Sequence, residues 1–212
     1  MTDSFHNYLK VSGANALDAV AQVAYALHRV RSDPRVQYVA HRDLHPGNIM
    51  GNDMSSPQYQ QLTIGGTTIG FQQNIEWQII DWGMSCMQVE GVKIETTEKH
   101  AFADKSTCNE AVDLTVLMHK LLLYPSTSAF AAQFFDAATQ DQMKKLIANK
   151  DQRFLYFGYY FPKENITPEL IFEKLSLLPR YMPRGPAGSV ESLKRQVSQS
   201  PYDKRTMRKL FY

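Results

Sequence analysis

Two short segments of the chain combine residue types that can carry out chemistry. The first reads His41-Arg42-Asp43-Leu44-His45-Pro46-Gly47-Asn48, and the second reads Asp81-Trp82-Gly83. A carboxylate such as Asp43 can orient an attacking hydroxyl, while amide and carboxylate oxygens are ligands that Mg²⁺ prefers. Asn48 and Asp81 provide such oxygens. This combination predicts phosphoryl transfer, a reaction that depends on positioning and charge rather than on covalent help from the protein.

The surrounding sequence predicts the elements that must position these segments. Residues 15–31 carry apolar side chains at spacings of three and four, which is typical of an amphipathic helix. Pro34 ends this helix because it lacks an amide hydrogen and restricts the residue before it. Residues 36–39 then form a short extended piece that leads into the first segment, and residues 76–80 form an apolar strand that ends at Asp81. The strongly apolar residues 111–123 indicate a buried helix.

The remaining patterns complete the predicted fold. Residues 51–61 are polar and look like an irregular surface excursion, followed by a hairpin at 62–69 whose Gly-Gly pair suits a tight turn. Further helices are expected at 128–148 and at 167–178, the latter with a Thr167 cap. The predicted fold is mainly α with a small β-hairpin region, an α+β arrangement.

Length and composition favour one soluble globular domain. The chain has 212 residues, of which 43% are hydrophobic and 21% charged. No apolar run reaches the roughly 20 residues that a membrane-spanning helix needs. The first residues do not resemble a secretory signal, so we expect an intracellular location, cytoplasmic or nuclear. Cys86 and Cys108 could pair, but this context favours two reduced thiols.

The C-terminal end is strongly basic. Residues 180–212 carry a net charge of +6, although the whole chain has only +2. A solvated tail is the simplest interpretation, while an acidic partner or nucleic acid is the alternative. The basic residues are Arg180, Arg184, Lys194, Arg195, Lys204, Arg205, Arg208 and Lys209.

The two segments resemble a known family. The loop at 41–48 resembles the catalytic loop of protein kinases, and Asp81-Trp82-Gly83 resembles their Asp-Phe-Gly motif. The details are similar to haspin-like kinases and to the divergent serine/threonine kinases of large DNA viruses, which also share His45 and Gly47. The interval of 33 positions from Asn48 to Asp81 and the lack of a following Ala-Pro-Glu agree with haspin-like kinases. Small-molecule phosphotransferases, which use a similar loop, remain a competing family.

The resemblance implies a domain plan. Residues 1–178 would form a protein-kinase-like C-terminal lobe, with the catalytic loop at 41–48, an insertion at 51–75 and the metal-binding motif at 81–83. Residues 179–212 would form a basic tail. The similarity itself covers residues 15–123, and its last part, Val112-Asp113-Leu114, resembles the helix whose aspartate anchors the catalytic loop.

The resemblance also implies residue roles. Asp43 would be the catalytic base, Arg42 would pair with a phosphate or carboxylate, and His45 would lie near the transferred phosphate. Asn48 and Asp81 would bind Mg²⁺ and, through it, ATP. At neutral pH a histidine at position 45 offers a hydrogen bond more often than a full charge. Structural roles would fall to His41, Gly83 and Asp113.

The chain departs from the kinase pattern at its N-terminal side. It contains no G-x-G-x-x-G motif, and only about 14 residues precede the first predicted helix. We therefore expect this chain alone to bind Mg-ATP weakly or not at all. It would be the active C-lobe of a kinase whose N-lobe comes from another chain. The alternatives are a retired lobe that serves as a scaffold or structural component of a larger assembly, such as a virus particle, and a minimal phosphotransferase.

Overall fold

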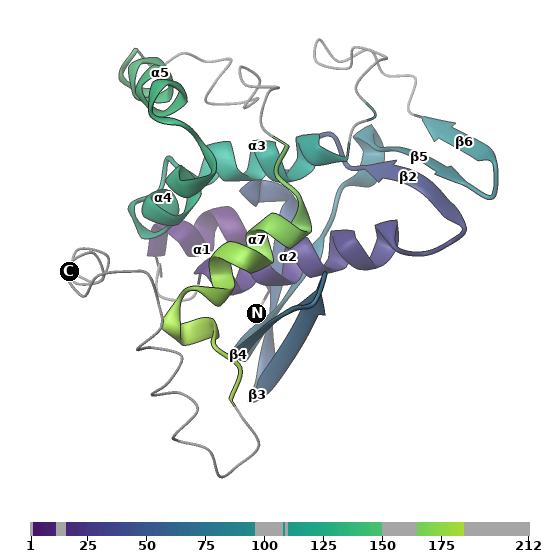
Figure 1. The fold of residues 1–212 in the computed structure, drawn as a ribbon, viewed down its shortest axis with the longest axis horizontal. Coiled ribbons are helices and arrows are strands. Elements are labelled where there is room, and N and C mark those ends of the chain that lie inside the picture. Colours follow the sequence, from purple (N-terminus) through teal and green to yellow (C-terminus); the bar gives the residue numbers. More distant parts are fainter. Residues whose placement is uncertain (1, 12–15, 96–107, 109, 150–164, 185–212) are drawn as a thin grey trace.

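The three-dimensional structure is a computed structural model, and it describes residues 2–11, 16–95, 108, 110–149 and 165–184. It has an α+β fold in which two small sheets flank a group of helices (Figure 1). None of the helices that it describes is long and apolar enough to span a membrane.

In the described residues, one short strand and two α-helices come first, most of the strands follow, and the remaining α-helices come last. The strands are β1 (Thr2–Ser4), β2 (Val36–Ala40), β3 (Ile49–Ile64), β4 (Thr67–Ile79), β5 (Cys86–Val89) and β6 (Val92–Glu95). The α-helices are α1 (Phe5–Val11), α2 (Ala16–Arg31), α3 (Ala111–Leu121), α4 (Pro125–Ala131), α5 (Ala137–Ala148) and α7 (Pro168–Ser176). Short 3₁₀ helices are η2 (Pro46–Asn48), η3 (Trp82–Met84), η4 (Ala132–Phe134) and η5 (Pro179–Tyr181).

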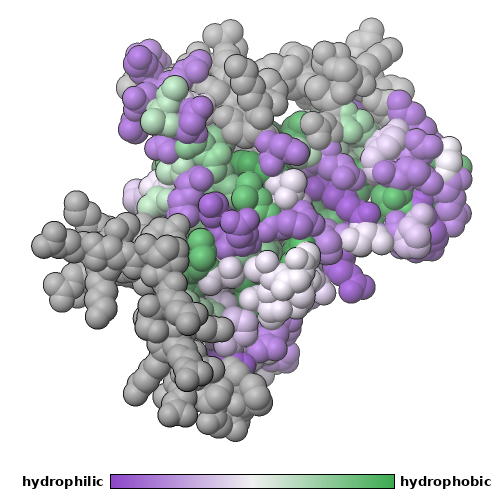
Figure 2. Space-filling model, in the orientation of Figure 1, coloured by the Kyte–Doolittle hydropathy of each residue, from purple (hydrophilic) through white to green (hydrophobic). Residues whose placement is uncertain are grey.

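The helices expected from apolar periodicity are confirmed. Helix α2 buries one face that includes Val20, Val23 and Leu27, and it packs against α7 and β4. Helix α7 begins after Thr167, whose hydroxyl accepts a hydrogen bond from the Leu170 amide at 3.3 Å, as an N-cap residue should. Figure 2 shows hydrophobic residues gathered between α3 and α7, with hydrophilic residues over α5.

The hairpin is much longer than the sequence suggested. Gly65 and Gly66, with φ values of 55° and 83°, form its turn, as expected. Residues 51–61 are not an irregular excursion, because strand β3 continues through them and pairs with β4. The register shifts between Asp53 and Gln58, and Pro57, which has no amide hydrogen, lies inside that interruption. Cross-strand pairing therefore overrides the polar, turn-like composition.

Several elements have no counterpart in the sequence-based prediction. Strand β1 and helix α1 lie within the first residues of the chain, and β1 adds to the edge of β3. Strands β2, β5 and β6 form a second antiparallel sheet. Strand β2 matches the extended piece expected at 36–39, whereas β5 and β6 are only four residues long, so local periodicity does not reveal them.

A disulfide joins Cys86 to Cys108, so the expectation of two reduced thiols was wrong. Cys86 lies on β5 directly opposite Ala40 of β2 and is fully buried. Cys108 lies just before α3, and the two Cα atoms are 6.0 Å apart, a usual separation for a disulfide. The pairing of β5 with β2 creates this proximity, which composition alone could not indicate.

The first residues of the basic tail pack against the lobe. The Tyr181 hydroxyl donates to Asp18 Oδ1 at 2.6 Å, and Arg180 Nη2 donates to Asp18 Oδ2 at 2.7 Å. Asp18 and Tyr181 are both buried, so this contact fixes η5 to the start of α2. The rest of the basic tail, residues 185–212, lies outside the described residues.

We expect the disulfide to stabilise the lobe by closing a loop across 22 residues of sequence separation. Loss of such a closure typically lowers the free energy of unfolding by about 3 kcal/mol. Urea denaturation of Cys108→Ala should show this loss, and reductant should lower wild-type stability while leaving the variant unchanged. Equal stability of wild type and variant under oxidising conditions would contradict this.

Candidate functional site

The loop at 41–48 is held by one buried carboxylate on α3. Asp113 is fully buried, and its two oxygens accept hydrogen bonds from the backbone amides of His41 at 2.9 Å and Arg42 at 2.8 Å. Arg42 has a left-handed backbone with φ of 70°, a conformation that non-glycine residues rarely adopt. Asp113 thus binds two consecutive backbone amides, those of His41 and Arg42, where the chain makes this turn.

Arg31 secures Asp113 in turn. Its Nη2 donates to Asp113 Oδ2 at 2.9 Å and to the Glu110 carbonyl at 2.7 Å, while its Nε donates to the Val39 carbonyl at 3.3 Å. The end of α2, strand β2 and the start of α3 therefore meet at one guanidinium. Burial raises the pKa of the Asp113 carboxyl, and the amides and the Arg31 guanidinium act against that rise.

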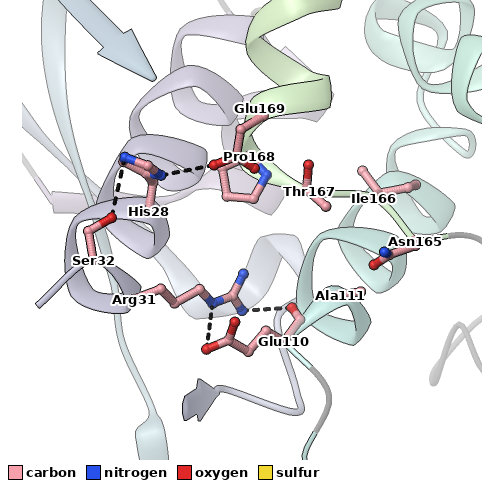
Figure 3. A pocket seen from close by; sticks show the side chains of 10 residues that line it. All are labelled: His28, Arg31, Ser32, Glu110, Ala111, Asn165, Ile166, Thr167, Pro168 and Glu169. Carbon is pink, nitrogen blue, oxygen red and sulfur yellow. Dashed lines mark hydrogen bonds and ion pairs between the residues drawn. The ribbon is translucent and has the colours of Figure 1, made fainter. Parts of the chain in front are cut away.

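A pocket of about 400 Å³ lies beside Arg31 (Figure 3). It opens between the end of α2, the start of α3 and the start of α7, with His28 and Glu169 joined across it at 3.1 Å. Asp43, Asn48 and Asp81 do not line it. The residues that line it are His28, Arg31, Ser32, Glu110, Ala111, Asn165, Ile166, Thr167, Pro168 and Glu169.

His41 links the loop to the segment that carries Asp81. The His41 Nδ1 accepts from the Asp43 amide at 3.3 Å, so the proton of a neutral ring resides on Nε2, which donates to the Ile80 carbonyl at 2.8 Å. The ring also meets Trp82 edge to face, with centroids 4.8 Å apart. His41 is fully buried, so both contacts are sheltered from water.

Asn48 makes the second link. Its Nδ2 donates to the Asp43 carbonyl at 2.9 Å and to Asp43 Oδ2 at 3.3 Å, and its own carbonyl accepts from the Ile80 amide at 2.9 Å. The β3–β4 register, in which Ile49 faces Ile79, places Asn48 opposite Ile80. Both backbone groups of Ile80 are therefore bound to the loop, and Asp81 follows immediately.

Asp81 stands at the exposed end of this connection. It has a left-handed backbone with φ of 60° and opens the 3₁₀ turn η3. A Cβ at Gly83 would lie 3.4 Å from Asp81 Oδ1, an ordinary van der Waals contact. A left-handed backbone raises the free energy of the folded state at non-glycine residues, and such residues are concentrated at functional sites. Arg42 and Asp81 are two of them.

His45 lies beside Asp43 without a full charge. Its Nδ1 accepts a hydrogen bond from the Gly47 amide at 2.9 Å, and its Nε2 lies 3.7 Å from Asp43 Oδ2. Burial lowers the pKa of His45 and the nearby Lys120 lowers it further, although Asp43 opposes both effects. At neutral pH the imidazole is therefore mostly uncharged.

Lys120 also belongs to the site around Asp43 and His45, although it was not predicted from the sequence. It follows Asp113 by seven residues on α3, about two turns, and so lies on the same helix face. Lys120 is 6% exposed, and burial lowers its pKa to about 8 in spite of attraction from Asp43. The sequence feature that could have indicated it is a lysine within the apolar run 111–123, at a spacing that puts it on the same helix face as Asp113.

The structure thus groups Asp43, His45, Asn48 and Lys120, and it ties Asp81 to them through Ile80. For Arg42, the contact that positions it in the loop is the backbone one to Asp113. In the described part of the chain, no three His, Cys, Asp or Glu side chains form a metal-binding group.

Two comparisons with known proteins gave no match. No family model matches the chain, and no curated protein matches its sequence.

We expect Asp113→Ala to destabilise the lobe and to loosen the loop. Removing one member of a buried charged pair typically costs about 3–5 kcal/mol, because its partners stay buried without compensation. Urea denaturation measures the cost, and hydrogen exchange at the His41 and Arg42 amides should accelerate. Asp33→Ala is the control: Asp33 pairs with Arg35, whose side chain is 66% exposed, and its loss should lower stability far less. Equal effects of the two variants would contradict the anchoring role.

Lys120→Met should stabilise the chain at neutral pH. The folded-state pKa of about 8 lies below the ordinary 10.5, so the unfolded chain binds more protons between these values and wild-type stability rises with pH there. At pH 7 the buried charge costs up to about 3 kcal/mol, which methionine avoids. Urea denaturation at pH 7, 9 and 10.5 should show the advantage of the variant shrinking. A pH-independent difference would contradict this, and Lys144→Met, at a side chain 72% exposed, is the control.

Proposed function

We propose that this chain is the C-terminal catalytic lobe of a serine/threonine protein-kinase-like phosphotransferase that works with an N-lobe from elsewhere. The observation that carries the proposal is the position of Ile80. Its amide bonds the Asn48 carbonyl and its carbonyl bonds the His41 ring, so the Asp43–Asn48 loop and Asp81 are held next to each other. These are the residues that phosphoryl transfer requires.

Asp43 is suited to receive the acceptor hydroxyl. Its side chain is 43% exposed, so an incoming group can reach it, and Asn48 Nδ2 bonds both its carbonyl and its carboxylate. The bond to Oδ2, at 3.3 Å, orients the carboxylate before a substrate arrives. Such prior orientation is a main source of rate enhancement when the protein does little covalent chemistry.

Asn48 and Asp81 fit a magnesium ion brought in with a nucleotide. Asn48 directs its amide nitrogen toward Asp43, which leaves Oδ1 available as a ligand, and the Asp81 carboxylate is exposed. Mg²⁺ in nucleotide sites usually takes one or two protein oxygens and completes its shell with phosphate oxygens and water. Bound there, it would neutralise negative charge on the phosphates.

A retired lobe that acts as a scaffold is the second candidate. The observation behind it is that the contacts of Asp113, Arg31 and His41 shape the loop without any nucleotide. The same fold could therefore persist after activity was lost, for example inside a larger assembly.

Mutations that remove one charge at a time separate the two candidates. The full chain, recovered from its own source with the chains that associate with it, should transfer phosphate from Mg-ATP to serine or threonine. Asp43→Asn should lower turnover about 10²–10⁴-fold without changing the melting temperature, because it removes the base but keeps the shape. Asp81→Asn should weaken magnesium-dependent nucleotide binding.

Asp141→Asn, an exposed carboxylate on α5, is the matched control and should behave like wild type. If no version transfers phosphate, and both site variants assemble normally, the scaffold candidate replaces the enzyme.

A further inference from the structure

Besides a magnesium ion, phosphoryl transfer at this site calls for a fixed positive charge close to the transferred group. Negative charge develops on the transferred group, and fixed cations close to it are a large source of stabilisation. His45 occupies the loop position nearest to Asp43, but its Nδ1 accepts the Gly47 amide hydrogen, a role that requires an unprotonated nitrogen. A cation must therefore come from elsewhere.

Helix α3 brings a cation to this place. Its Asp113 bonds the start of the loop, and Lys120 lies about two turns further along the same face, where α3 packs against η2. Lys120 is 6% exposed, and its ammonium group interacts with Asp43 and acts on His45. The Asp43 side chain is 43% exposed, so an acceptor and a phosphate can approach it from the solvent.

We propose that Lys120 supplies, from helix α3, the fixed positive charge that the phosphoryl group meets at Asp43, in place of a cation at position 45. This inference rests on the proposed function and adds a residue that the loop motif does not contain. It gives a role to a lysine that is buried on the same helix face as Asp113.

Binding of magnesium tripolyphosphate to the full chain, recovered with the chains that associate with it, tests this assignment. The dissociation constant, measured by calorimetry, should rise at least about tenfold in Lys120→Met, because a charged hydrogen-bond donor to the phosphates is lost. Lys120→Arg keeps the charge and should bind within about threefold of wild type. Lys144→Met removes a lysine that is 72% exposed and paired with Asp141, and should leave binding unchanged.

A relocated charge distinguishes this role from a structural one. Adding His45→Lys to Lys120→Met places a lysine beside Asp43 from the loop instead of from α3. The double variant should recover most of the lost affinity, whereas a packing defect at Lys120 would not respond to a charge at position 45. Circular dichroism and melting temperature verify that each variant is folded.

The outcomes separate this inference from the function on which it rests. Binding that weakens in Asp81→Asn but not in Lys120→Met overturns the role of Lys120 and leaves phosphoryl transfer standing. Binding that depends on Lys120 but not on Asp81 or magnesium supports an anion site at Lys120 and removes support for phosphoryl transfer. Absence of saturable binding in wild type, or failure of both Lys120→Arg and the double variant to bind, overturns the inference.

Discussion

The buried carboxylate of Asp113 is the interaction on which the rest of this structure depends. It accepts the amides of His41 and Arg42 at the point where the chain leaves β2, and Arg31 holds it from behind. Buried backbone amides need partners, and a left-handed residue such as Arg42 persists only where its surroundings compensate for the strain. One side chain therefore fixes the direction in which the 41–48 loop starts.

The long β3–β4 hairpin supplies the second constraint. Its register carries the end of β4 back to the loop, so that Asn48 faces Ile80 and His41 reaches the Ile80 carbonyl. A shift of one residue would turn every side chain of the strand to the opposite face. The position of Asp81 thus depends on a hairpin whose Gly65-Gly66 turn lies at the far end of the pair.

Electrostatics at the site oppose stability. Lys120 is buried at a cost, and burial also keeps His45 uncharged. Burial strengthens each remaining interaction, because the local dielectric is lower than that of water. A buried cation beneath an exposed carboxylate suits a site that receives a negatively charged group, and it would be a poor choice for packing alone.

Residue patterns along the chain were sufficient to predict the local features: helices α2, α3 and α7, the glycine turn of the hairpin, and the segments 41–48 and 81–83 as candidates for chemistry. These follow from periodicity, capping and turn chemistry, which act between neighbours in the chain. Three features became visible only in the folded chain: the strand through residues 51–61, the disulfide between Cys86 and Cys108, and the interaction of Lys120 with Asp43. Each of these depends on pairing between distant segments, which one-dimensional patterns do not encode.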